Sequence, residues 1–245
     1  MAYCYKTTLS YRGGNFCGWQ TQPEKRTVQG VMTEAAEKVL GDGTTVTGCS
    51  RTDSGVHAKG FVALIKAEKE IEPSQLVRAL NANLPDDVAV TSCETAEEDF
   101  HPRYSVKAKT YEYVIYDGER EDPFENGLSC RYRHRIDEKK LNEEAAYVIG
   151  RQDFRAFMAA GSKVTDTVRT VYECGVRREG DRVYIRITGD GFLYNMVRII
   201  AGTLVMIWEK GLPSSEMAEI ISSCDRSRAG MTFPPEGLYL MKVTY

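Results

Sequence analysis

Two successive series of strand-like and helix-like segments predict an α+β protein with two similar α/β halves, each a mostly antiparallel mixed sheet flanked by helices. Alternating apolar residues mark the strands, and apolar residues at helical spacing mark the segments between them. Hydrophobic residues make up 42% of the 245 residues, enough for one large core or two ordinary ones. The pattern lapses around residues 94–104, so we predict halves at 1–103 and 104–245.

The first half follows the order strand, helix, strand, helix, strand. Residues 3–11 alternate and are rich in Tyr and Thr, as in a half-buried strand. After a glycine-rich loop, apolar residues at helical spacing predict a helix over residues 28–40 that ends at Gly41. The remaining elements are a strand, turn and strand within 46–66, a helix at 73–84 and a strand at 88–90.

The second half repeats this theme. It contains a strand at 110–116, a helix capped by Asp137 and ended by Gly150, strands near 167–177 and 183–188, a long helix from Phe192, a helix after Pro213 and a final strand at 238–245. The apolar run at 192–208 contains Asn195 and Arg198 and is too short to cross a bilayer comfortably. We expect a buried helix and no membrane segment.

Composition narrows the functional classes. The formal net charge is -3, so a nucleic-acid site has to be a local basic patch. The seven cysteines are scattered without a C-x-x-C pair, and the amino terminus lacks an apolar signal region, which favours free thiols in a cytoplasmic protein. The three histidines share no ligand spacing with one another or with cysteine, so we expect no metal site.

The stretch G-C-S-R-T-D-S-G-V-H-A-K-G at residues 48–60 places Arg51, Asp53 and His57 among small residues. Asp-Ser-Gly is ordinary turn material, and His57 is most simply a turn or core histidine. If residues 51–53 are extended, however, Arg51 and Asp53 project from the same side. An arginine at that distance keeps a carboxylate ionised and restrains its rotamers.

Other candidates are ambiguous by themselves. Arg198 interrupts an apolar helix, so it should have a carboxylate partner, either a structural one or one in an active site. Tyr111 and Tyr113 share one face of a strand, where they are half-buried sheet residues or stack on a base. Arginine clusters at 131–135, 177–182 and 226–228 are either solvated faces or parts of a phosphate-binding groove.

The glycine-rich loop at residues 13–18 lies between a strand and a helix, as phosphate-binding turns do. It matches neither common phosphate-binding pattern, which makes a nucleotide cofactor the weaker interpretation. A tight loop with a core Trp19 is the simpler one. The third interpretation is that the Phe16 and Trp19 rings are exposed and stack on bases.

These motifs together resemble the tRNA pseudouridine synthase A family. The most specific is R-T-D-S-G-V-H-A at residues 51–58, and the supporting matches follow the family's order along nearly the whole chain. They are Y-R-G-G-N-F-C-G-W-Q-T-Q at 11–22, T-V-Q-G at 27–30, K-T-Y-E-Y at 109–113, D-F at 153–154 with Phe157, R-T-V at 169–171, F-L-Y-N-M-V-R at 192–198 and E-G-L-Y-L at 236–240.

The resemblance implies a pseudouridine synthase fold and a cofactor-free isomerisation of uridine to pseudouridine in the anticodon stem and loop of tRNA. It implies that Asp53 is the nucleophile, that Arg51 displaces the target base, that Tyr111 stacks on the uracil and that Arg198 pairs with Asp53. His57 and Lys109 join Arg51 and Tyr111 as substrate-binding candidates. It also implies a homodimer whose two subunits form the tRNA-binding clefts together.

Three positions depart from the family pattern: Arg12, where Asp is common; Ser50, where Gly is common; and Lys109, where Arg is frequent. Lysine keeps the charge but loses the bidentate geometry of arginine. Two other functions remain as alternatives. One is an RNA-binding module whose Asp53 is only a turn residue, and the other is a nucleotide-dependent enzyme that uses the glycine-rich loop.

Overall fold

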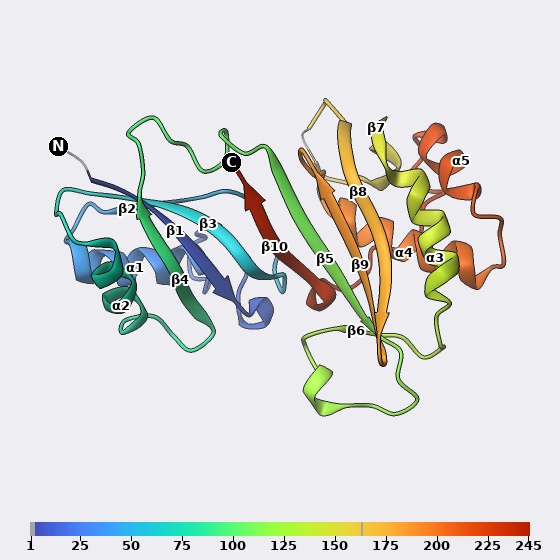
Figure 1. The fold of residues 1–245 in the computed structure, drawn as a ribbon, viewed down its shortest axis with the longest axis horizontal. Coiled ribbons are helices and arrows are strands. Elements are labelled where there is room, and N and C mark those ends of the chain that lie inside the picture. Colours follow the sequence, from blue (N-terminus) through green and yellow to red (C-terminus); the bar gives the residue numbers. More distant parts are fainter. Residues whose placement is uncertain (1–2, 163) are drawn as a thin grey trace. The chain divides into compact units, whose positions relative to one another are not determined.

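The computed structural model describes residues 3–162 and 164–245, and the chain divides into two compact units (Figure 1). Unit 1 is the chain up to Lys107 together with Tyr239–Tyr245, and unit 2 is Ala108–Leu238. Each unit combines sheet strands with its own helices, which confirms the predicted α+β class with mostly antiparallel pairing. Within the described ranges, no helix is long and apolar enough to span a membrane.

The strands of unit 1 follow the order β4-β1-β3-β10, and β2 pairs with β3. The β1/β3, β1/β4 and β2/β3 pairs are antiparallel, whereas β10 runs parallel to β3, with Tyr239 opposite His57. The bounds are Tyr3–Tyr11 for β1, Thr45–Gly48 for β2, His57–Ala67 for β3, Val88–Thr95 for β4 and Leu238–Thr244 for β10.

Two helices complete unit 1. The predicted helix over residues 28–40 is confirmed as α1 (Val28–Leu40), because the Thr27 hydroxyl accepts a hydrogen bond from the Gly30 amide and Gly41 ends the helix at φ 99°. The second helix, α2, is Pro73–Asn81 and buries Leu76 and Leu80. The two helices pack on each other, α1 against β2 and α2 against β4.

The strands of unit 2 follow the order β5-β9-β8-β7 with antiparallel pairing, and the short β6 runs parallel to β5. Their bounds are Ala108–Tyr116 for β5, Cys130–Arg131 for β6, Gly150–Asp153 for β7, Val168–Glu179 for β8 and Arg182–Gly189 for β9. The helices are α3 (Glu138–Ala145), α4 (Met196–Glu209) and α5 (Glu216–Ser223), and α4 is buried on nearly every side. Figure 1 shows α3 to α5 together on this sheet.

Three predicted boundaries were wrong. The long helix begins at Met196 rather than Phe192, because Asn195 takes a left-handed conformation with φ 59° in a turn at residues 194–195. The helix capped by Asp137 ends at Ala145, and Gly150 begins β7 instead of ending that helix. The second helix ends at Asn81, three residues earlier than expected.

The carboxyl terminus also differs from the predicted division into 1–103 and 104–245. Residues Tyr239–Tyr245 belong to unit 1, because β10 pairs with β3. A local pattern identifies 238–245 as a strand but contains no information about its partner, since strand pairing is a long-range property.

Candidate active site

The loop at residues 49–56 connects β2 to β3 and is held at several points. Thr52 is buried, its hydroxyl lies 2.8 Å from the Tyr11 hydroxyl, and its carbonyl accepts a hydrogen bond from the Trp19 amide at 3.1 Å. The Val56 amide donates to the Asp53 carbonyl at 3.2 Å, so the predicted turn is present. The loop leaves Arg51 exposed and Asp53 half-buried, two residues apart.

The glycine-rich loop packs against this turn. A Cβ atom on Gly13 would lie 2.0 Å from the Val56 carbonyl oxygen, and one on Gly18 would lie 2.6 Å from that of Thr52. Only glycine permits such close approach of two backbones. The glycines therefore hold the Asp53 loop in position, which gives them a structural role that requires no bound phosphate.

The expectation that Phe16 and Trp19 are exposed stacking rings was wrong. Trp19 is 1% exposed and stacks on Phe61 at 4.1 Å, and Phe16 is 2% exposed. The Arg26 guanidinium lies 4.0 Å above the Phe16 ring and pairs with Asp87 at 2.8 Å. The core-Trp interpretation of this loop is the correct one.

His57 lies at the start of β3 with 1% of its surface exposed. Its Nδ1 accepts a hydrogen bond from the Gly13 amide at 2.9 Å, and its ring stacks on Tyr239 at 4.6 Å. These contacts join the end of the Asp53 loop to the glycine-rich loop and to β10. The arrangement favours a positioning role for His57 over direct contact with a substrate.

Tyr111 and Lys109 lie on β5 in unit 2. The Tyr111 ring is 7% exposed and meets the Phe192 ring edge to face, with 5.1 Å between the centroids. Tyr113 is fully buried, and its hydroxyl donates to the Pro234 carbonyl at 2.7 Å. The two tyrosines therefore differ: Tyr113 is a core residue, whereas Tyr111 forms an aromatic pair near the edge of the core.

Phe192 is a residue of interest that the sequence reasoning did not single out. It lies shortly before the turn that precedes α4, in the same F-L-Y-N-M-V-R motif as Arg198. Its placement follows from the left-handed Asn195, which separates Phe192 from the helix.

Arg198 lies in the first turn of α4 and is half-buried. Its Nε donates to the Phe233 carbonyl at 2.6 Å, and its Nη1 donates to Asn195 Oδ1 at 2.7 Å. The Phe233 amide returns a hydrogen bond to the Arg198 carbonyl at 3.3 Å. Two neutral oxygen acceptors of unit 2 therefore help to fix the orientation of this guanidinium.

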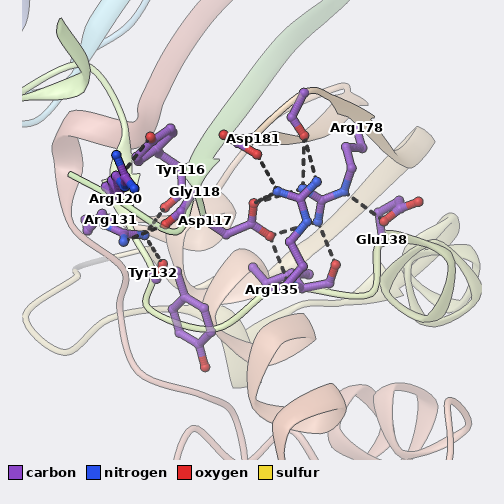
Figure 2. A network of polar contacts seen from close by, with 12 residues as sticks. Tyr116, Asp117, Gly118, Arg120, Arg131, Tyr132, Arg135, Glu138, Arg178 and Asp181 are labelled. Atoms are coloured by element: carbon purple, nitrogen blue, oxygen red, sulfur yellow. Dashed lines mark hydrogen bonds and ion pairs between the residues drawn. The ribbon is translucent and has the colours of Figure 1, made fainter. Parts of the chain in front are cut away.

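Many arginines of the three clusters are engaged by groups of unit 2 (Figure 2). The fully buried carboxylate of Asp117 accepts two hydrogen bonds of 2.8 Å from Arg178 and one of 3.2 Å from Arg135. Arg131 donates to the carbonyls of Tyr116 and Gly118. Further pairs join Arg177 to Glu112, Arg182 to Glu125 and Arg228 to Glu216.

The structure thus divides the predicted site residues between the two units. Arg51, Asp53 and His57 lie on one loop and the strand after it in unit 1, and Lys109, Tyr111 and Arg198 lie in unit 2. The pairing of Asp53 with Arg198 stays a prediction.

Comparisons with known proteins define the class as RNA-modifying isomerases. A family model described as tRNA pseudouridine synthase matches residues 9–105 and 145–245. The tRNA pseudouridine synthase A of Ruminiclostridium cellulolyticum is 42% identical over 241 residues, which are 98% of each chain. The proteins of that name from a Thermoanaerobacter species and from Clostridium acetobutylicum are 41% and 40% identical over 97% and 98% of each chain. The chain belongs to the tRNA pseudouridine synthase family.

Membership in this family confirms the resemblance seen in the motifs and makes the protein a pseudouridine synthase with the corresponding fold. The RNA-binding module without catalysis and the nucleotide-dependent enzyme are therefore the wrong classes for the chain as a whole.

Proposed function

We propose that the protein isomerises uridine to pseudouridine in the anticodon stem and loop of tRNA, with Asp53 as the nucleophile. The family supports uridine isomerisation in tRNA. The observation that supports the role of Asp53 is the rigid loop at residues 49–56, which holds this carboxylate half-buried and two residues from the exposed Arg51.

The reaction sets three requirements. A stacked uridine hides its reactive atoms, so the nucleotide has to leave the helix at a cost of roughly a few kcal/mol. Arg51 is exposed and long enough to occupy the space that the base vacates. An ionised carboxylate, supplied by Asp53, then attacks the ribose or the base, and the glycosidic bond breaks. The bond to the carboxylate breaks again when the uracil carbon bonds to the ribose, and that carbon gives up its proton.

The detached uracil has to turn before it rejoins the ribose through carbon. We assign its retention to the face of Tyr111, because an aromatic face holds a planar base but lets it rotate. Hydrogen bonds to the base would fix its orientation. Arg198 is the proposed partner that keeps Asp53 ionised, and its fixed guanidinium suits that role. Lys109 is the proposed phosphate contact. We further propose that the enzyme is a cytoplasmic homodimer, which sedimentation over a range of concentrations tests.

Asp53→Asn tests the nucleophile. The amide has the shape of the carboxylate but cannot attack, so pseudouridine formation on an unmodified tRNA transcript should fall by at least a thousandfold, or roughly 4 kcal/mol of barrier. Affinity for tRNA should stay within about twofold of wild type, or under roughly 0.5 kcal/mol. Mapping pseudouridine in the product RNA also tells whether the modified uridines lie in the anticodon arm.

Asp42→Asn is the matched control, since Asp42 is exposed in the turn after α1. It should keep full activity. An Asp53→Asn protein that still turns over at the wild-type rate would refute the assignment of the nucleophile, and modification confined to another arm of tRNA would refute the proposed substrate region.

A further inference from the structure

Unit 1 contains a pocket of about 170 Å³ that adjoins the Asp53 loop. Three segments line it: residues 19–20 with Gln29, the end of β2 with Ser50 and Arg51, and residues 101–104 without the buried Pro102. The volume is more than ten times the roughly 10–15 Å³ that one water needs, so the pocket has room for a planar ring. Arg51 belongs both to this pocket and to the proposed active site.

The lining is basic and contains no carboxylate. Within the described residues, neither Arg51 nor Arg103 forms a hydrogen bond or an ion pair with its guanidinium. This distinguishes them from the arginines of the unit 2 clusters, many of which have carboxylate or carbonyl partners. Two unneutralised guanidinium groups at one pocket favour an anionic ligand.

The segment at residues 101–104 presents an aromatic face. Tyr104 is 77% exposed, and its ring stacks on His101 with 4.2 Å between the centroids. The backbone amides of Arg103 and Tyr104 both donate to His101 Nδ1, and the Tyr245 hydroxyl anchors the Pro102 carbonyl at 2.8 Å. The turn is therefore fixed while its two outer side chains remain available to a ligand.

The opposite wall offers polar groups that can contact the edge of a base. Gln29 donates to the Val46 carbonyl at 2.8 Å and accepts from Gln20 at 2.8 Å. These two bonds fix the orientation of the Gln20 amide. Its carbonyl oxygen forms no hydrogen bond with any residue in the described part of the chain, so it can accept one from an exocyclic amino group of a base.

We propose that this pocket binds one nucleotide of the tRNA next to the target uridine, with its base stacked on Tyr104 and its phosphate on Arg103. The proposal rests on the proposed function, because Arg51 connects the pocket to the displaced base. A ring platform beside unpaired guanidinium groups matches the chemistry of an unstacked nucleotide. The pocket then holds the neighbour of the target while Arg51 occupies the position that the target leaves.

The experiment measures the affinity of full-length protein for an unmodified tRNA transcript at several salt concentrations, in an Asp53→Asn background so that the RNA is not modified. Tyr104→Ala should weaken binding about tenfold at every salt concentration, since the substitution removes a stacking ring but no charge. Tyr104→Phe should bind as the background protein does, because it keeps the ring. Arg103→Ala should weaken binding and lower the slope of log K against log salt by about 0.7, the value for one phosphate contact to a single strand.

Arg78→Ala is the matched control, because Arg78 is exposed on α2 of the same unit and lies outside the pocket. It removes the same charge and should change the slope by less than half as much. The proposal is overturned if Arg103→Ala changes the salt slope no more than Arg78→Ala does, or if Tyr104→Phe and Tyr104→Ala weaken binding equally. It is also overturned if the pocket variants have a lower melting temperature but an unchanged affinity for tRNA.

A pseudouridine assay on the protein that retains Asp53 distinguishes a failure of this proposal from a failure of the proposed function. Absence of pseudouridine from a bound transcript would refute the function and leave the nucleotide pocket supported by the binding series. Normal pseudouridine formation with unchanged affinity in both pocket variants would refute the pocket and leave the function intact.

Discussion

The buried carboxyl group of Glu144 in α3 makes the stability of unit 2 depend on pH. The residue is 2% exposed, and its Oε2 forms no hydrogen bond within residues 3–162 and 164–245. Burial, with a smaller contribution from Glu143, raises the pKa of Glu144 to about 8. The folded protein therefore keeps this group protonated at pH values at which the unfolded chain has ionised it.

The sign of the pH dependence follows. The folded-state pKa of Glu144 lies above its unfolded value of 4.5. The contribution of this group to stability is therefore fully present below pH 4.5 and is lost as the pH rises through about 8. Glu144→Gln removes this loss, so the substitution should stabilise the protein by about 4 kcal/mol more at pH 8 than at pH 4. Thermal melts of both proteins across this range measure the difference.

Glu34→Gln serves as the control, because Glu34 is an exposed residue of α1. Its effect should be small and nearly independent of pH. A parallel pair of stability curves for Glu144→Gln and wild type would show that the buried carboxyl group is not the source of the pH dependence.

The residues of the site differ in how far the sequence could predict them. Asp53 and Arg51 were candidates in the sequence because a specific motif places them two residues apart, and their roles stay a prediction. Phe192 was not, because an apolar residue before an apolar helix looks like one more core residue. Arg103 and Tyr104 were assigned to a boundary region, since charged and turn residues without periodicity give no sign that they line a pocket.

At the scale of elements, Asp117 connects three parts of unit 2 (Figure 2). It follows the end of β5, receives the Arg178 guanidinium from β8 and accepts the Ile136 amide at 2.8 Å just before α3. Burial is the largest single influence and would raise the pKa of Asp117, but the hydrogen bonds from Arg178 and the Ile136 amide, together with the charges of Arg178 and Arg135, outweigh it, so the pKa is lowered. This group therefore contributes stability above the unfolded pKa, and the contribution is lost on acidification below about pH 4.

Asp117→Ala should destabilise the protein by about 3–5 kcal/mol, because it leaves the largely buried Arg178 without its partner. Arg135→Ala should cost about 0–1 kcal/mol, because this arginine is half exposed and its second carboxylate, Asp181, is exposed as well. Urea denaturation at pH 7 measures both. Similar losses for the two variants would contradict the view that the Asp117–Arg178 pair is the structural centre of the network.

Elements with a complete set of local signals were predictable. The helix α1 has a capping Thr27, an apolar stripe and Gly41, and both of its ends were placed correctly. The start of α4 was misplaced because Phe192 and Leu193 continue the apolar run of the helix, and a single Asn195 does not by itself predict a left-handed conformation. The parallel pairing of β10 with β3 could not be predicted for a different reason, since it depends on residues far away in the chain.

Across the whole molecule, the distribution of charge matters more than its sum. Counting gives 32 basic and 35 acidic residues, a balance that excludes a uniformly basic surface but does not reveal which cations are neutralised. The structure adds that information, since arginines of all three clusters have carboxylate partners in unit 2. We therefore expect the salt dependence of tRNA binding to come from a small set of unpaired cations, with Arg51 and Arg103 among them.

Arg228 and Glu216 allow a test at this scale, because they form an ion pair of 2.8 Å and neither side chain is deeply buried. Replacing both, as Arg228→Met with Glu216→Gln, removes the pair without changing the net charge. Affinity for tRNA and its salt slope should both stay at the wild-type values, because a cation held by a carboxylate releases few counterions from the RNA. A slope reduced by about 0.7 would instead mean that this arginine contacts a phosphate, so that the clusters paired within unit 2 would have to be counted as part of the tRNA-binding surface.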